Sequence, residues 1–160
     1  MAIRCDVSPQ EIDDFLIKSA SLIMEYMLKA LTKLGEESIV KARNRSAAES
    51  WVDHTGNLRS SIGYSVYNHG LKYMQSAFST VLSGSKGRNE GMRMVQQLAK
   101  EYSNVFALVV LAAMDYAEYV EAVKSKDVLE STRIWAMSVV EERLTRAKEE
   151  AIKVINSWDI

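Results

Sequence analysis

The hydrophobic pattern near the start of the chain predicts a long amphipathic helix. Ser8-Pro9-Gln10-Glu11 has the order of a capping box with proline at the first helical position. Apolar residues then recur at helical spacing, at Ile12, Leu16, Ala20, Ile23, Met27, Leu31 and Leu34. Gly35 is a natural terminator, so we expect a kink there and a second helix from Glu36 to about Ser46. These segments predict a helical arm over about 9–48.

The middle of the chain changes to the alternation that is typical of a strand. After the turn residues of 53–57 the chain alternates with period two. One side has Leu58, Ser60, Ile62, Tyr64 and Val66, and the other has Arg59, Ser61, Gly63, Ser65 and Tyr67. Asn68-His69-Gly70 predicts a turn, and Leu71 to about Phe78 predicts the returning strand. We therefore expect an antiparallel hairpin.

Two later segments also predict strands, separated from the hairpin by a short helix over about Glu90–Tyr102. Val105–Leu111 is apolar throughout, which predicts a strand buried on both faces. Alternation resumes over Tyr116–Glu121. In a strand, Tyr116 and Tyr119 would point to opposite faces, because they are three residues apart. The sheet and the short helix thus occupy about 57–122.

The C-terminal segment predicts a second long helix, over about 127–157. Asp127 and Glu130 have the spacing of a cap. The apolar positions that follow alternate in steps of three and four: Met137, Val140, Leu144, Ala147, Ala151, Val154 and Trp158. This helix either packs on the protein's own sheet or pairs with a helix of another chain. About three heptads is the lower limit for a coiled coil, which favours packing on the sheet.

The order of these elements predicts an α+β fold in a single domain over 1–160. We expect a small, mainly antiparallel sheet, made of the hairpin and the buried strand, packed against long N- and C-terminal helices. The 160 residues include one cysteine, Cys5, which excludes an intramolecular disulfide. The longest apolar run, Val105–Met114, is too short to cross a membrane. We expect no membrane association, and synthesis in a cytoplasm.

The charge balance argues against a dedicated nucleic-acid binder. Lys plus Arg is 20 and Asp plus Glu is 21, for a net charge of −1. A local basic patch remains open, because basic residues gather at Lys41, Arg43 and Arg45 and again at Lys86 and Arg88. Such a patch would contact DNA phosphates without sequence preference, as a minor contribution.

Ser83–Asn89 is the one Gly/Ser-rich stretch, and we expect an exposed, mobile loop that carries Lys86 and Arg88. The favoured interpretation is a solvated loop. Two alternatives are an anion site at the N-terminus of the following helix and a segment that becomes ordered when a partner docks.

Candidate catalytic residues are sparse, so we expect no enzyme, no cofactor and no metal. The two histidines are His54 and His69, both in turns. His54 lies beside Asp53 and near Ser60, but the Gly-x-Ser-x-Gly elbow is absent and turn polarity explains these residues better. One cysteine and two histidines provide no ligand pair at zinc spacing. No dinucleotide or Walker motif occurs.

Two segments together resemble a known family. Asp53-His54-Thr55-Gly56-Asn57-Leu58-Arg59-Ser60-Ser61-Ile62 resembles the D-T-G-N-L-R-x-S-I signature of tail-completion, or head–tail joining, proteins of long-tailed bacteriophages and prophages. The minor tail protein Z group of lambda-like phages is related to them. Tyr116-Ala117-Glu118-Tyr119-Val120-Glu121 is similar to the second signature, Y-A-x-Y-V-E. The chain departs from the family at the inserted His54 and at 122–126, where a Gly-rich turn is usual.

The first motif also has a physical logic of its own. Gly56 and Asn57 tolerate the positive φ of a tight turn after Thr55. We expect this turn to direct Leu58 inward and Arg59 outward at the start of the strand. Arg59 can then pair with a carboxylate of the second motif, with Glu118 or Glu121 as candidates, or with a neighbouring subunit.

The resemblance implies a non-catalytic structural protein of the virion that acts at the head–tail junction. Its expected partners are a tail terminator, a head-closure protein and further copies in a ring, while the free protein is a monomer. The residues expected at interfaces are Asp53, Thr55, Gly56, Asn57, Leu58, Arg59, Tyr116, Glu118, Tyr119 and Glu121. The alternative is a helical interaction or oligomerisation module unrelated to phage.

Overall fold

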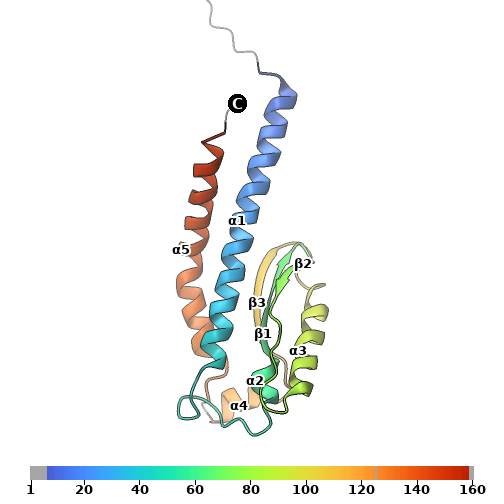
Figure 1. Ribbon diagram of the computed structural model, residues 1–160, viewed down its shortest axis with the longest axis vertical. Coiled ribbons are helices and arrows are strands. Elements are labelled where there is room, and N and C mark those ends of the chain that lie inside the picture. The colour runs from blue at the N-terminus through green and yellow to red at the C-terminus, as the bar shows by residue number, and fades with distance from the viewer. Residues whose placement is uncertain (1–6, 125, 159–160) are drawn as a thin grey trace, which may run out of the picture.

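Two long antiparallel helices, α1 (Pro9–Arg43) and α5 (Glu130–Ile155), run the length of the molecule (Figure 1). This computed structural model describes residues 7–124 and 126–158. The predicted capping box is confirmed, because the Ser8 hydroxyl accepts the Glu11 N–H at 3.2 Å and the Glu11 carboxylate accepts the Ser8 N–H at 2.7 Å. The predicted break at Gly35 is wrong. Gly35 lies inside α1 against the ring of Tyr64, where a side chain would collide.

The C-terminal apolar repeat packs within the chain, against α1. At one end of the pair, the rings of Phe15 and Trp158 meet edge to face with centroids 6.0 Å apart. Farther along, Arg143 of α5 forms an ion pair with Glu37 of α1 at 2.6 Å. Ala147 and Ala151 are buried. The helix therefore packs chiefly on α1, and not on the sheet as expected.

The sheet has three strands in the order β2-β1-β3, with β1 antiparallel to both neighbours. The strands are β1 (Ile62–Asn68), β2 (Leu71–Gln75) and β3 (Phe106–Ala112). The predicted hairpin is confirmed, although β2 ends three residues before Phe78. His69 and Gly70 both have positive φ, 50° and 78°, as a two-residue type I′ turn requires.

Alternation along β1 and β3 divides the core between the two faces of the sheet. Tyr64 and Val66 face α1, where they pack with Leu28 and Leu31. Tyr67 faces the other way and packs with Val95 of α3 (Ser85–Leu98). The predicted α+β fold is confirmed, with long helices against a small antiparallel sheet. Helix α3 adds a third layer on the second face (Figure 1).

Two segments predicted as strands are short helices at the end of the molecule where the loops gather, which we call the base (Figure 1). Asn57–Ser61 forms α2, and β1 begins only at Ile62. Ala117–Lys124 forms α4. In segments this short, a strand and a turn of helix bury similar positions. Leu58 and Ile62, for example, are an even number of residues apart, which suits one face of a strand, and four residues apart, which suits one face of a helix.

Two further predictions are corrected. The Gly/Ser-rich stretch is not a mobile loop, because Ser85 begins α3, with Lys86 and Arg88 exposed in its first turn. Strand β3 is not buried on both faces. Phe106 is 38% exposed and Leu108 is only partly buried, because β3 lies at an edge of the sheet. Among the described residues, no helix has the length and apolar character needed to cross a membrane.

Candidate interface at the base of the molecule

The two motifs meet in one apolar cluster, although they lie far apart in sequence. Leu58 of α2 and Ala117 of α4 are both buried there, and Val120 packs against the same cluster. The cluster ties the end of α1 to the start of α5, and its buried members are Ala42, Trp51, Leu58, Ile62, Met114, Ala117 and Val128. The structure thus brings the predicted site residues to a common place.

Arg59 pairs with Asp53, six residues before it, and not with Glu118 or Glu121. Its Nε donates to Asp53 Oδ2 at 2.9 Å, with the two side chains only 16% and 14% exposed. The guanidinium carbon also lies 5.0 Å from the centre of the Trp51 ring, within cation–π range. The expected partner was wrong because Arg59 lies on α2, whose short turn brings it back over the loop that carries Asp53.

Thr55, Gly56 and Asn57 connect this loop to α3. Gly56 has φ of 76° and lies against the backbone of Val81, so the predicted tight turn is confirmed. The Thr55 hydroxyl accepts the Asn57 N–H at 3.3 Å. The side-chain oxygen of Asn57 accepts the Gly87 N–H at 3.1 Å. The Gly87 N–H in the first turn of α3 is therefore already bonded. An anion at this end of the helix would need such N–H groups as donors.

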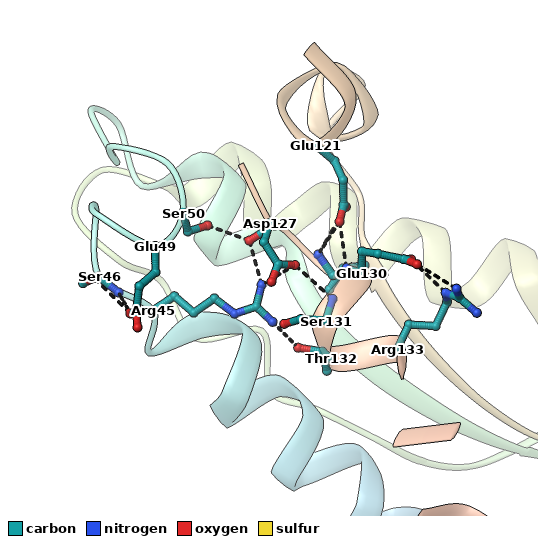
Figure 2. A network of polar contacts seen from close by, with 11 residues as sticks. Arg45, Ser46, Glu49, Ser50, Glu121, Asp127, Glu130, Ser131, Thr132 and Arg133 are labelled. Atoms are coloured by element: carbon teal, nitrogen blue, oxygen red, sulfur yellow. Dashed lines mark hydrogen bonds and ion pairs between the residues drawn. The ribbon is translucent and has the colours of Figure 1, made fainter. Parts of the chain in front are cut away.

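The second motif divides into a structural and an exposed part. The Glu121 carboxylate accepts the N–H of Leu129 at 3.2 Å and the N–H of Glu130 at 2.7 Å, so it caps the start of α5 (Figure 2). Glu118 and Tyr119 are exposed, the tyrosine to 60%. Tyr116 is 40% exposed. Tyr116 lies directly before α4 and Tyr119 lies within its first turn. The prediction that they point to opposite faces of a strand is therefore wrong.

Tyr116 of the second motif lies near enough to Asp53 of the first for the carboxylate charge to act on its hydroxyl. Partial burial raises the pKa of its hydroxyl, and the nearby Asp53 carboxylate raises that pKa further. The phenol is therefore neutral at ordinary pH and can donate a hydrogen bond at the surface.

A second polar network, which neither motif indicated, lies beside this cluster (Figure 2). Arg45 Nη1 forms an ion pair with Asp127 Oδ1 at 2.6 Å, and Nη2 donates to Thr132 Oγ1 at 2.6 Å. The Ser50 hydroxyl donates to the Asp127 carbonyl at 2.7 Å. The sequence clues are the place of Arg45 in a basic cluster and the cap spacing of Asp127, but the two residues lie more than 80 positions apart.

The network keeps the Asp127 carboxyl ionised although it is partly buried. Burial opposes ionisation of its carboxyl, but hydrogen bonds from the Ser131 hydroxyl and N–H and the charge of Arg45 outweigh it and lower the pKa. The Ser131 N–H lies 3.1 Å from Asp127 Oδ1, so the carboxylate also serves the first turn of α5. Asp127 was predicted as the cap, but Leu129 is the N-cap residue and Glu130 the first residue of α5, so Asp127 reaches the Ser131 N–H from two residues before the cap.

The predicted basic patch is divided among separate contacts. Lys41 Nζ lies 5.3 Å from the centre of the Trp135 ring, and Arg43 Nη2 donates to the Ser79 carbonyl at 2.6 Å. Arg45 is engaged by Asp127 and Thr132. Lys86 and Arg88 are exposed on α3.

The residues of the imagined hydrolase site have structural partners. Asp53 pairs with Arg59, and the buried Ser60 hydroxyl accepts the Val81 N–H at 2.8 Å. His54 is exposed, whereas the ring of His69 packs on Phe106 at the hairpin. Within 7–124 and 126–158, no three His, Cys, Asp or Glu side chains are grouped so that they could hold a metal ion.

No protein-family model, no curated protein and no solved structure matches this chain.

Proposed function

We propose that this chain is a structural protein of a phage or prophage virion that acts in head–tail joining or tail completion. It works as a non-catalytic adaptor whose base contacts a neighbouring protein of the junction. The proposal places it in the virion after synthesis in the bacterial host. Its partners are a tail terminator, a head-closure protein and other copies of itself in a ring, and contact with DNA is minor.

The observation that carries this proposal is the meeting of the two motifs in one cluster. Their buried members, such as Leu58, and the Arg59–Asp53 pair hold the loops of the base in place. Their exposed members, Tyr116, Glu118 and Tyr119, lie on the surface of the same end. Rigid loops that present exposed aromatic side chains suit an assembly interface, because Tyr contributes contact area at a small cost in side-chain entropy.

A helical interaction module is the second candidate. It is favoured by the exposed apolar side chains on the first half of α1, where Ile12, Leu16 and Ile17 are 49%, 57% and 66% exposed. This candidate would place the interface on the arm and leave the base without a partner.

Particle composition tests the proposed function first. The source culture is treated with a DNA-damaging agent, phage-sized particles are pelleted, and their proteins are identified by mass spectrometry. We expect the chain at a few copies per particle. Its absence from intact tailed particles whose other proteins are detected would contradict a role as a stable virion component.

Complementation of a deletion then separates the two candidates. We expect the double variant Tyr116→Ala/Tyr119→Ala to leave heads and tails unjoined in electron micrographs, whereas Ile17→Ala restores joined particles like the unaltered chain. The reverse result would favour the helical module. Both variants alter exposed side chains, so circular dichroism should confirm that each is folded.

A further inference from the structure

The sheet presents an open edge at β3. In the described structure β3 pairs only with β1. The bonds from the His69 N–H to the Val105 carbonyl and from the Ala113 N–H to the Ser61 carbonyl show which residues exchange hydrogen bonds with β1. By the alternation of an antiparallel ladder, the N–H and C=O groups of Leu108 and Val110 point away from β1. These backbone groups are available to another strand.

An apolar groove of about 670 Å³ lies beside this edge. It is lined by Met27 and Leu31 of α1, Leu108 and Val110 of β3, and Met137 and Val140 of α5. Among the residues that the structure describes, Arg133 is the one charged residue that lines it. A strand that pairs with β3 would therefore bury apolar side chains in the groove.

Strand β3 has none of the features that protect a sheet edge. Its seven residues, FALVVLA, include no charged residue and no proline. Free edges are usually shortened, charged or bulged, because an apolar edge invites another strand to pair. The edge of β3 therefore has the properties of an interface.

The β3 strand of a second copy is the less suitable occupant of this edge. Antiparallel pairing of two β3 strands would leave β2, the other edge of the sheet, without a partner in both copies. The exposed apolar side chains of β2 would then stay in contact with solvent.

The β2 strand of a second copy has the complementary properties. It is the other open edge of the sheet, and its Leu71, Tyr73 and Met74 are 74%, 39% and 45% exposed. Met74 pairs with Val66, so it lies on the face of the sheet that α1 covers only in part. In a second copy this is the face that would turn toward the groove.

The spacing of the layers also fits. Adding three strands per copy moves the next α1 by roughly 14 Å, since strands lie about 4.8 Å apart. Packed helices lie about 8–10 Å apart, so α5 can contact both its own α1 and the next one if it is raised from the sheet. Figure 1 shows α5 on the side of α1 that faces away from the sheet.

We propose that β3 of one copy pairs with β2 of the next, so that the sheet continues from copy to copy. Because β2 and β3 are both antiparallel to β1, the pairing is parallel when every copy has the same orientation. Such a head-to-tail contact generates a ring when the rotation closes. This inference deepens the self-association in the proposed function and rests on it.

Cysteine cross-linking of the purified full chain tests this interface. In a Cys5→Ser background, one protein carries Val105→Cys beside the start of β3 and another carries Leu71→Cys at the start of β2. Both positions are exposed, at 48% and 74%, so the fold should tolerate the changes. The two proteins carry tags of different size, are mixed at high concentration and are treated with a short bis-maleimide. A matched control replaces Leu71→Cys with Gln96→Cys, an exposed position on α3.

We expect mixed dimers of the Val105→Cys and Leu71→Cys proteins at roughly ten times the yield of the Gln96→Cys control, because an interface raises the effective concentration of the two thiols. A chain with both cysteines should form a ladder of larger products. Homodimers of the Val105→Cys protein in place of mixed dimers, or mixed dimers at the control yield, would overturn the proposal. The virion test does not depend on this contact, so the two proposals can fail separately.

Discussion

Two ion pairs hold the irregular segment between α1 and α2 against the rest of the molecule. Arg59–Asp53 joins the segment to α2, and Arg45–Asp127 joins it to the residues just before α5. The desolvation of a partly buried pair offsets much of its attraction, so such a pair is poor evidence for net stability. Removal of one partner is different, because the other charge then remains partly buried without compensation.

We therefore predict that Arg59→Ala destabilises the protein by about 2 kcal/mol, and that Asp53→Ala costs a similar amount. The double variant should cost less than the sum, with a coupling of about 1 kcal/mol or more. Denaturant unfolding measures all three variants. Arg93→Ala is the control, because its pair with Glu90 is exposed and should change stability by less than about 0.5 kcal/mol. Equal effects of Arg59→Ala and Arg93→Ala would contradict this account.

A second prediction concerns pH. The pKa of Asp127 is lowered in the folded protein, so its ionised form stabilises the fold above the unfolded value of about 3.9. This stabilisation is lost as pH falls from that value through the lower folded pKa. Asp127→Asn should therefore be less stable than the unaltered protein at pH 7, and the difference should shrink below about pH 4. Unfolding at a series of pH values measures it, and a difference that stays constant with pH would contradict the assignment.

Among the elements, α3 shows why glycines in a helix need not indicate flexibility. Gly84 is the N-cap of α3, and Gly87 and Gly91 lie on the face of α3 that approaches α2 and Phe78; all three are buried. A Cβ at residue 87 would collide with the backbone of Asn57. The glycines therefore permit a close approach of two elements.

We predict that Gly87→Ala destabilises the protein by about 1–3 kcal/mol. In a helix exposed to solvent, the same change would stabilise the helix by about 1 kcal/mol, because alanine has the higher helix propensity. Ser85→Ala in the same turn is the control, because Ser85 is exposed and its change should stay within about 0.5 kcal/mol. Thermal or denaturant unfolding provides the comparison. A stabilised Gly87→Ala protein would show that α3 does not pack closely on α2.

The long elements could be predicted from the sequence, and the short ones could not. Helix α1, the hairpin turn and α5 each carry a cap, a turn pair or a repeat over many residues. Helices α2 and α4 are only five and eight residues long, so one turn of helix and a strand bury nearly the same side chains. The continuation of α1 past Gly35 depends on Tyr64, a tertiary contact that no local pattern reveals.

At the scale of the whole molecule, the residues of the candidate site could be predicted but their partners could not. The motifs identified Arg59 and Glu121, yet the misassigned strands separated Arg59 from Asp53 and left Glu121 without its role at α5. The Arg45–Asp127 contact joins residues 82 positions apart, which the pattern of a single sequence does not encode. The prediction that β3 is buried on both faces failed because burial depends on the order of the strands, which the sequence pattern also does not encode.

The contact between Phe15 and Trp158 has a consequence for how the gene can be rearranged. Their rings lie 6.0 Å apart, so the first turns of α1 and the last turn of α5 are neighbours at the end of the molecule opposite the base. A short Gly/Ser linker can therefore connect these helices, with new termini opened in the turn at 99–104. Such a circular permutant would turn α1 and α5 into one continuous helical hairpin and leave the motif residues at the base unchanged.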